Sequence, residues 1–257
     1  MARRREAPIY RLARAARHGR MQAAMIETKA EEEFKSAKGF DLSTPAGRQR
    51  AETDLMWTDH GFLRRRFHNF HWVSPEMARA NQPAPADLAR YKAMGIKTIL
   101  NLRGRSDTGY YWLEREACAA LGLALVDAPL GSREAPSVER VLRAKAIFES
   151  IEYPALMHCK SGADRAGLMA VLYRHFRQGA PIEEARDQLA LTYLHVKHGK
   201  TGVLDYVFER YLEETRASGE SFLSWVQSPA YDPARLKAEF KPSFWGNVVV
   251  DALLRRE

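Results

Sequence analysis

Short apolar runs alternate with amphipathic segments through the middle of the chain, and this alternation restricts the fold more than any other feature. The runs at residues 96–102, 123–130 and 154–159 have the length and aliphatic content of buried strands. The segments between them have helical spacing and exceed the roughly twelve residues that a crossover between parallel strands needs. We therefore predict an α/β fold with a mostly parallel central sheet flanked by helices.

The predicted helices begin and end at recognisable residues. Asp87 has the position of an N-cap and Gly95 that of a stop, and Ser137 and Gly122 delimit later helices. The stretch before Asp87, residues 74–86, is predicted as a proline-rich turn. A helical C-terminal half is expected from three further segments with helical spacing, at residues 166–179, 181–194 and 202–218.

The length and the cysteine content of the chain limit the classes of protein to which it can belong. A chain of 257 residues is long enough for one domain with extensions. Its only cysteines are Cys118 and Cys159, and lone thiols are typical of a reducing compartment, so we expect a cytoplasmic protein. No apolar run approaches the ~20 residues of a transmembrane helix, which predicts a soluble protein. We expect a basic extension at residues 1–65, a core domain at 66–215 and a tail packing on the core at 216–257.

The positive charge of the chain is concentrated at its start. Residues 1–20 contain seven arginines and one glutamate, within a formal net charge of +8 for the whole chain. Three interpretations remain open, namely a solvated tail, an arm that contacts an anionic surface, and a mitochondrial-type presequence. No aromatic stacking pattern or zinc-ligand spacing accompanies the charge, so no specific nucleic-acid partner is predicted.

The sequence HCKSGADR lies where the last predicted strand turns into a helix. Cys159 ends the strand at the carboxyl edge of the sheet, where open α/β sheets bind their ligands. A glycine-containing turn into a helix N-terminus directs several backbone N–H groups toward one point and forms an anion site. The guanidinium of Arg165 adds a planar fork that fits two phosphate oxygens. This stretch therefore predicts a site for a phosphate dianion.

A helix N-terminus and a nearby cation also stabilise a thiolate. Cys159 is accordingly predicted as a nucleophile that attacks phosphorus in line, with Arg165 holding the phosphate oxygens. The backbone amides of the loop form the cradle, so its residues are the predicted substrate-binding set: Lys160, Ser161, Gly162, Ala163 and Asp164.

The motif in which Cys159 is followed by five residues and Arg165 resembles the signature of the protein tyrosine phosphatase superfamily. The upstream stretch ARANQPAPADLARYKAMGIKTILNLRGR is similar to the entry of its compact dual-specificity and bacterial members, in which R-x-x-Q-P precedes a GI-K-T strand. The match covers roughly residues 70–215. The resemblance implies a phosphomonoester hydrolase that works through a cysteinyl-phosphate intermediate and needs neither metal nor cofactor.

The resemblance also implies a general acid about thirty residues before the cysteine. Asp127 lies 32 positions upstream at the end of a predicted strand and is the first candidate. Its alternative role is that of a turn-capping carboxylate. Asp164 is the second candidate, since lipid phosphatases of the myotubularin type have an aspartate before the arginine, and Glu134 is the third.

Two positions depart from the superfamily pattern. Ala166 stands where many members have a serine or threonine whose hydroxyl helps to expel the cysteine. Two expectations follow and stay open: hydrolysis of the intermediate is slow, or it uses Ser161 or a water instead. Lys160 matches the first loop lysine of phosphoinositide phosphatases, but Ala163 stands at their second basic position. The substrate therefore remains open among a phosphoprotein, a phosphoinositide or other phospholipid, and a small phosphate ester.

Other interpretations of the loop stay open. A rhodanese-like loop that transfers sulfur and a phosphate-binding module without turnover both present a cysteine or an anion nest of this kind. His158 is predicted to have a structural role, and Cys118 to be a core residue or a redox partner of Cys159. Arg103 and Arg105 are predicted to bind substrate or to pair with Glu114 or Glu116. The remaining candidates are possible pocket or rim residues: Tyr110, Tyr111, Trp112, His195, Lys197, His198 and Lys200.

Overall fold

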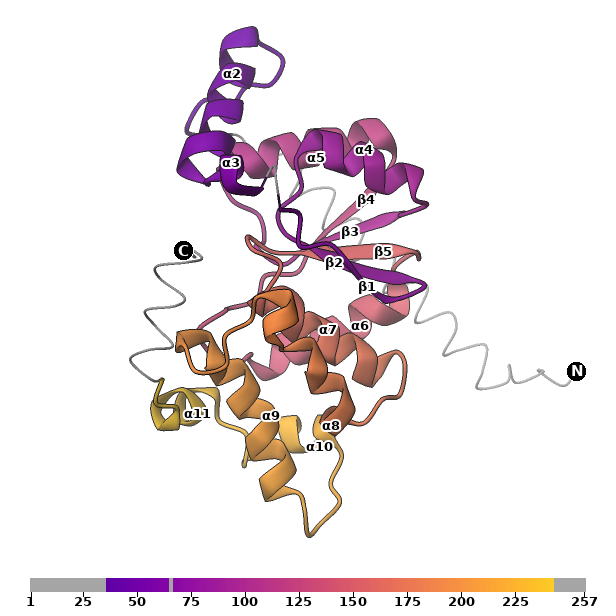
Figure 1. The fold of residues 1–257 in the computed structure, drawn as a ribbon, viewed down its shortest axis with the longest axis vertical. Coiled ribbons are helices and arrows are strands. Elements are labelled where there is room, and N and C mark those ends of the chain that lie inside the picture. Colours follow the sequence, from indigo (N-terminus) through magenta and orange to yellow (C-terminus); the bar gives the residue numbers. More distant parts are fainter. Residues whose placement is uncertain (1–35, 65–66, 243–257) are drawn as a thin grey trace, which may run out of the picture. The chain divides into compact units, whose positions relative to one another are not determined.

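The computed structural model describes residues 36–64 and 67–242 (Figure 1). The arginine-rich segment 1–20 lies outside these residues, so its contact with an anionic surface stays a prediction. A compact unit begins at Phe40. The division into an extension, a core domain and a tail likewise remains a prediction.

A five-stranded sheet forms the centre of this unit, in the order β1-β2-β5-β3-β4 (Figure 1). Only β1 is antiparallel to its neighbour, whereas the pairs β2·β5, β5·β3 and β3·β4 are parallel. The predicted α/β fold with a mostly parallel sheet is therefore confirmed. The strands are β1 (His71–Ser74), β2 (Met77–Ala80), β3 (Thr98–Asn101), β4 (Ala124–Asp127) and β5 (Ala155–His158).

Strand β2 corrects the prediction of a turn at residues 74–86. All of its residues are buried, and it pairs with β5 beside the predicted loop. The sequence pattern does not indicate this strand, because it contains no β-branched or aromatic residue and includes Arg79. Burial on both faces, and not local propensity, stabilises it.

Helices cover both faces of the sheet (Figure 1). On one face α4 and α5 pack against Ala78, Ile99 and Leu156, and on the other α6 and α7 pack against Met77 and Met157. The helical elements are α2 (Pro45–Thr53), η1 (Asp54–Thr58), α3 (Gly61–Arg64), α4 (Pro85–Ala93), α5 (Gly109–Leu121), α6 (Val138–Ser150), α7 (Asp164–Phe176), α8 (Ile182–Ala185), η2 (Arg186–Gln188), η3 (Leu191–Tyr193), η4 (Lys200–Gly202), α9 (Val203–Glu214), α10 (Phe222–Gln227) and α11 (Pro233–Glu239).

Most helix ends fall where the sequence predicts them. Ser137 caps α6 by accepting a hydrogen bond from the amide of Arg140, and Gly122 ends α5 with a φ of 62°. Asp87 is a correction, because the N-cap of α4 is Ala84 and Asp87 occupies the third helical position. From there its Oδ2 accepts the hydrogen bond of the Ala84 amide at 3.0 Å, so the carboxylate still caps the helix.

The segment at 181–194 is a second correction. A single helix is predicted there, but the chain forms α8 and the short turns η2 and η3. The interruption follows Gln188, whose carbonyl oxygen accepts a hydrogen bond from Arg79 and not from a later residue of a continuing helix. A tertiary contact thus overrides the helical pattern.

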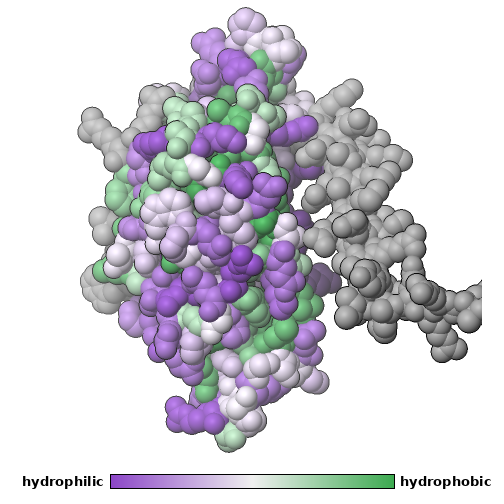
Figure 2. All heavy atoms as spheres, turned by 90° about the vertical axis from the view of Figure 1, so that its right-hand side faces the viewer, coloured by the Kyte–Doolittle hydropathy of each residue, from purple (hydrophilic) through white to green (hydrophobic). Residues whose placement is uncertain are grey.

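Apolar side chains reach the surface in patches among hydrophilic ones on the face shown in Figure 2. Within the described ranges, every helix is too short or too polar to cross a membrane.

Candidate active site

The loop between β5 and α7 is held tightly against the end of β2. Gly162 has a φ of 75°, a conformation that side chains with a Cβ rarely adopt. A Cβ at this position would lie 2.7 Å from the carbonyl carbon of Ala80 and equally close to the amide nitrogen of Asn81. Glycine is therefore required for both the turn and the close approach.

The first two carbonyl groups of the loop are bonded by the segments that flank the β1–β2 hairpin. The carbonyl oxygen of Lys160 accepts a hydrogen bond from the amide of Gln82 at 3.3 Å. The carbonyl oxygen of Ser161 accepts one from Nδ2 of Asn69 at 2.9 Å. Both carbonyls consequently point outward from the loop.

The next two carbonyl groups are bonded by the buried guanidinium of Arg79. Its Nη2 donates to the carbonyl oxygens of Gly162 at 3.0 Å and Ala163 at 2.9 Å, while Nη1 donates to that of Gln188 at 2.8 Å. Burial lowers the pKa of Arg79 to about 10, against opposing attraction from Cys159 and nearby acidic groups. The side chain thus remains a cation at neutral pH beneath the loop.

These bonds determine which way the amides of the loop face. The N–H and C=O groups of a trans peptide point in opposite directions. Four consecutive carbonyls turned outward therefore turn the N–H groups of the following residues, Ser161 to Asp164, toward the inside of the loop. Amides arranged in this way are suited to bind an anion, and they lie at the beginning of α7, next to the buried Cys159.

His158 belongs to a buried polar chain behind the loop. Its Nε2 lies 2.6 Å from Oε1 of Glu114, and both side chains are fully buried. The other carboxylate oxygen of Glu114 accepts a hydrogen bond from Nε2 of Gln82 at 2.9 Å. The same glutamine therefore supports the loop with its backbone and the histidine, through Glu114, with its side chain.

Arg103 corrects the expected pairing with Glu114 or Glu116. Its guanidinium forms a two-pronged pair with Asp59, at 2.6 and 2.8 Å, and also donates to Oε1 of Gln82 at 2.9 Å. Glu116 pairs with Arg48 instead. Arg103 is thus a structural cation that joins the end of β3 to the turn after η1.

Asp127 lies at the carboxyl edge of the sheet, in register with Asn101 and His158 across β4, β3 and β5. Two inter-strand spacings place its Cα ~10 Å from that of His158. The carboxylate accepts hydrogen bonds of 2.8 Å from Nδ2 of Asn101 and the hydroxyl of Tyr111, and Arg105 Nε lies 3.9 Å away. Burial and the carboxylate raise the pKa of Tyr111, which therefore remains a donor.

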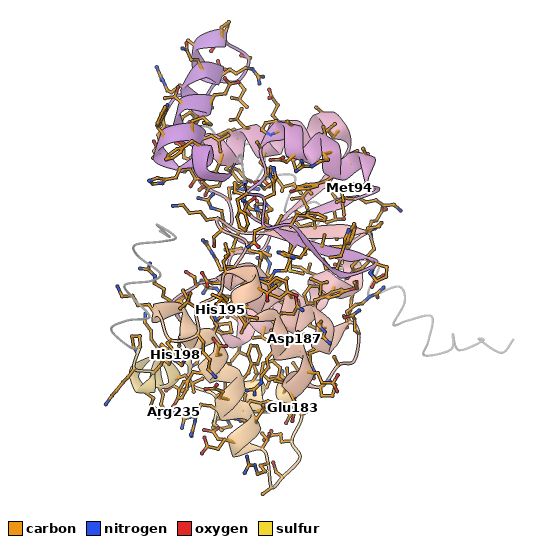
Figure 3. All side chains as sticks on the ribbon, viewed as in Figure 1. Met94, Glu183, Asp187, His195, His198 and Arg235 are labelled. Atoms are coloured by element: carbon orange, nitrogen blue, oxygen red, sulfur yellow. The ribbon has the colours of Figure 1, made fainter. Side chains whose placement is uncertain are left out.

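Asp164, the first residue of α7, is held by a buried histidine. Its Oδ1 lies 2.8 Å from Nδ1 of His195, and Nε2 of the same imidazole lies 2.6 Å from Oδ2 of Asp205 in α9. Figure 3 labels His195 among the side chains of the helical half. Burial opposes the charged imidazole, but the two carboxylates outweigh it and raise the pKa of His195 to about 9. A histidine cation thus joins the first residue of α7 to α9, which disfavours Asp164 as a proton donor.

This bridge predicts a pH-dependent stability. A folded-state pKa of about 9 exceeds the ~6.5 of an unfolded histidine, so the stabilisation is complete below pH ~6.5 and is lost as the pH rises through about 9. We expect the free energy of unfolding to fall by up to about 3 kcal/mol over this window in urea titrations. The variant His195→Gln should be less stable at pH 6 and lack most of this fall. An identical pH dependence in both chains would contradict the charged bridge.

Several other candidates have partners away from the loop. Glu134 pairs with Arg140 and Lys197 with Glu209, each at 2.6 Å. Cys118 is buried in the core cluster that contains α4 and α5, where burial raises its pKa, whereas Cys159 belongs to the cluster on the other face of the sheet. No group of three or more His, Cys, Asp or Glu side chains within 36–64 and 67–242 is arranged to hold a metal ion.

Sequence reasoning missed the residues that support the loop from behind. Arg79 and Gln82 belong to the R-x-x-Q-P turn, so the pattern marked their positions without indicating their contacts. The sequence gives no local signal for Asn69 or Asp205. Asn69 lies 92 positions before its partner Ser161, and Asp205 lies 10 positions after its partner His195, so only the tertiary fold brings each pair together.

A family model described as "DSP-PTPase phosphatase fused to NAD+ Kinase" matches residues 73–203, about half of the chain. The dual specificity protein phosphatase TpbA of Pseudomonas aeruginosa is 30% identical over 121 residues, which are 47% of this chain and 53% of that protein. The chain thus spans about half the length of the curated relatives it matches.

Solved structures also resemble the chain. A crystal structure of P. aeruginosa TpbA in complex with pTyr has a TM-score of 0.40 and 20% identity, and covers 49% of this chain and 75% of that one. A crystal structure of PTPMT1 has a TM-score of 0.44 and 14% identity, and covers 59% of this chain and 99% of that one.

The residues that match the family model contain β2, β5, the loop from Cys159 to Arg165, and both Arg79 and Gln82. On the family match, the chain belongs to the dual-specificity branch of the protein tyrosine phosphatase superfamily, in the family described as a phosphatase fused to NAD+ kinase.

Proposed function

We propose that the chain hydrolyses phosphate monoesters through a cysteinyl-phosphate intermediate on Cys159. The observation that carries this proposal is the outward bonding of four consecutive loop carbonyls, which leaves the intervening amides to bind an anion beside the thiol. Membership of a phosphatase family supports it, as does the name of the curated relative.

The proposed reaction begins with in-line attack of the Cys159 thiolate on phosphorus. An S–P bond forms while the P–O bond to the leaving group breaks, and Asp127 gives its proton to the departing oxygen. The amides of the loop and the guanidinium of Arg165 bind the three equatorial oxygens, where charge accumulates in the transition state. Water then attacks the cysteinyl phosphate, gives a proton back to Asp127 and releases phosphate and the thiolate.

Asp127→Asn tests the acid. An amide cannot supply a proton, so we expect kcat for phenyl phosphate to fall by about 10²-fold. The decline in rate from acidic to neutral pH should disappear in this variant, because no carboxylic acid remains to be deprotonated. Rate measurements between pH 4 and 8 with matched Asp164→Asn and Glu134→Gln chains assign the role. If the pH profile of Asp127→Asn is unchanged, the proton donor is whichever of Asp164 and Glu134 abolishes the decline in rate when it is replaced.

Ala166 supports a second candidate, a phosphate-binding module without turnover. It is fully buried in the first turn of α7 and supplies no hydroxyl to help expel the cysteine. With para-nitrophenyl phosphate, slow breakdown of the intermediate predicts a burst of nitrophenol followed by a slower steady rate. A burst that is followed by no further release would favour the module.

The experiment that tests the proposed function is hydrolysis of para-nitrophenyl phosphate by the purified chain, with and without a chelator. Metal-independent release of nitrophenol and a phosphate adduct on the Cys159 peptide after acid quenching are expected. Thiocyanate formation from thiosulfate and cyanide, in the absence of phosphate release, would instead indicate sulfur transfer.

A further inference from the structure

The loop that is proposed to bind a phosphate dianion contains an acidic side chain, that of Asp164. Asp164 is the buried first residue of α7, and its backbone amide is one of those turned toward the inside of the loop. The lengths of the covalent and hydrogen bonds place its carboxylate within ~8 Å of a phosphate oxygen bound to that amide. Two negative charges this close repel each other when they are shielded from water, so an uncompensated carboxylate would weaken the binding of phosphate.

The buried side chain of His195 compensates this charge. Its Nδ1 lies 2.8 Å from Oδ1 of Asp164, and its Nε2 lies 2.6 Å from Oδ2 of Asp205. Because an ionised carboxylate only accepts hydrogen bonds, two such contacts require a proton on both ring nitrogens. The geometry of its contacts therefore makes His195 an imidazolium, in agreement with its raised pKa of about 9.

The backbone around His195 is fixed beside the loop. Nδ2 of Asn69 donates hydrogen bonds to the carbonyl oxygen of Ser161 in the loop, at 2.9 Å, and to that of Tyr193, at 3.1 Å. Leu194, directly before His195, has a φ of 66°, a conformation that residues with a branched side chain rarely adopt. Such conformations persist where the surrounding contacts enforce them, and they are common at functional sites. The backbone, and not the ion pairs alone, thus holds the imidazole in its place.

We propose that His195 is a positioning residue for the phosphate of the substrate: its imidazolium neutralises Asp164, and this lets the loop accept a dianion beside an acidic residue. Asp205 has a supporting role, because it stabilises the imidazolium from α9, two positions beyond the family-matched residues. Since the loop is taken as the site of the phosphoryl group, this role rests on the proposed function.

The test is a double-variant cycle measured by calorimetric binding of inorganic phosphate at pH 7. His195→Gln removes the cation and leaves the carboxylate, so the dissociation constant of phosphate should rise by about tenfold. Asp164→Asn removes the repelling charge and should bind phosphate at least as tightly as the unaltered chain. The double variant has neither charge and should recover most of the affinity that His195→Gln loses. A double variant that binds no better than His195→Gln would indicate a merely structural contact and would overturn the proposal.

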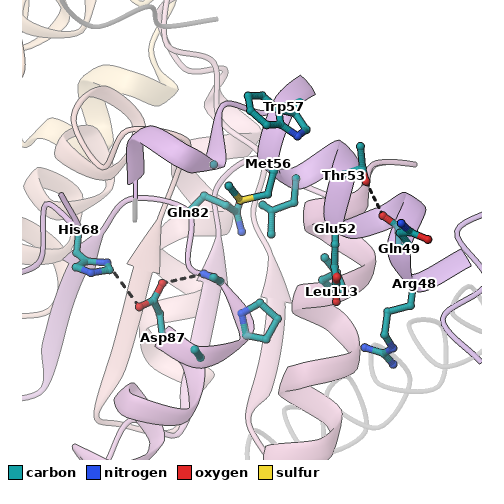
Figure 4. A pocket seen from close by; sticks show the side chains of 15 residues that line it. Arg48, Gln49, Glu52, Thr53, Met56, Trp57, His68, Gln82, Asp87 and Leu113 are labelled. Carbon is teal, nitrogen blue, oxygen red and sulfur yellow. Dashed lines mark hydrogen bonds and ion pairs between the residues drawn. The ribbon is translucent and has the colours of Figure 1, made fainter. Parts of the chain in front are cut away.

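Two controls match the charge and the type of the replaced residues. Glu52→Gln also removes a carboxylate, but Glu52 is exposed on α2, where it lines a cavity of about 810 Å³ that has no residue of 159–165 in its lining (Figure 4). His175→Gln replaces a histidine near the end of α7, whose Nδ1 lies 2.9 Å from the carbonyl oxygen of Ala180. Both variants should bind phosphate as the unaltered chain does. A tenfold weakening in His175→Gln as well would count against a specific role of His195.

The pH dependence of binding tests the same role without removing the histidine. The titratable groups that face its imidazole are Asp164 of α7 and Asp205 of α9. Phosphate should bind more weakly to the unaltered chain as the pH rises through about 9, because loss of the proton leaves the charge of Asp164 uncompensated. The weakening should begin at a lower pH in Asp205→Asn and be absent in Asp164→Asn. Arg79, with a pKa of about 10, is common to all three chains and cancels in the comparison. Coincident curves in the three chains would contradict the role of His195.

Hydrolysis of para-nitrophenyl phosphate by the same chains separates the role of His195 from the proposed function. If the unaltered chain releases no nitrophenol, the proposed function fails, but a defect of His195→Gln in phosphate binding that the double variant repairs still supports the role of His195. If nitrophenol is released and His195→Gln binds phosphate as tightly as the unaltered chain, the role of His195 alone is wrong.

Discussion

Replacing Cys159 with serine is expected to lower kcat for para-nitrophenyl phosphate by more than about 10³-fold. A serine hydroxyl is almost entirely protonated at neutral pH, so it is a much weaker nucleophile than the thiolate proposed for Cys159. Phosphate affinity should persist, because the amides and Arg165 remain. The measurement is a steady-state assay paired with calorimetric binding of inorganic phosphate.

The matched control is Cys118→Ser, the other cysteine of the chain. Cys118 is buried in α5 on the opposite face of the sheet, so its replacement should affect stability and leave the chemistry intact. Retention of full activity by Cys159→Ser would refute the nucleophile, and loss of phosphate binding along with activity would show that the variant disrupts the cradle instead.

Replacing Arg79 with methionine should damage both stability and activity. The aliphatic stem is kept, but the carbonyl oxygens of Gly162, Ala163 and Gln188 lose their donors in a buried site. We expect a loss of about 3–5 kcal/mol in the free energy of unfolding. Because a displaced loop misplaces the amides, kcat should also fall by about 10²-fold in the fraction that remains folded.

Arg79→Lys and Arg177→Met serve as the comparison variants. Lysine keeps the charge but lacks the fork that bonds three carbonyls, so it should restore only part of the stability. Arg177 is 41% exposed and pairs with Glu76 at the surface, so its replacement should cost less than about 1 kcal/mol. If Arg79→Met unfolded no more easily than Arg177→Met, the guanidinium would not be the support of the loop.

The sequence contains enough information for strands β3, β4 and β5 and for most helices. The runs around β3, β4 and β5 are aliphatic and bounded by glycine or proline, and each intervening helix has a cap or a glycine stop. Strand β2 and the interruption at Gln188 could not be predicted, because both depend on Arg79, a charged residue whose partners are distant in sequence.

The sequence likewise predicts one part of the candidate site and not the other. The loop from Cys159 to Arg165 is contiguous, and its geometry follows from a strand, a glycine and a helix N-terminus in immediate succession. The residues that orient the loop come from three other segments of the sequence, and only the tertiary fold brings them into contact with it. The pairing of Arg103 with Asp59 escaped prediction for this reason, since Asp59 lies 44 positions earlier.

The most direct test of the account is a crystal structure of the chain grown with orthovanadate, which takes up the geometry of a phosphoryl group in transfer. We expect vanadium bonded to Sγ of Cys159, with its equatorial oxygens about 3 Å from the amides of residues 161–164 and from the Arg165 guanidinium. Vanadate bound elsewhere, or a loop whose carbonyls point at the anion, would contradict it.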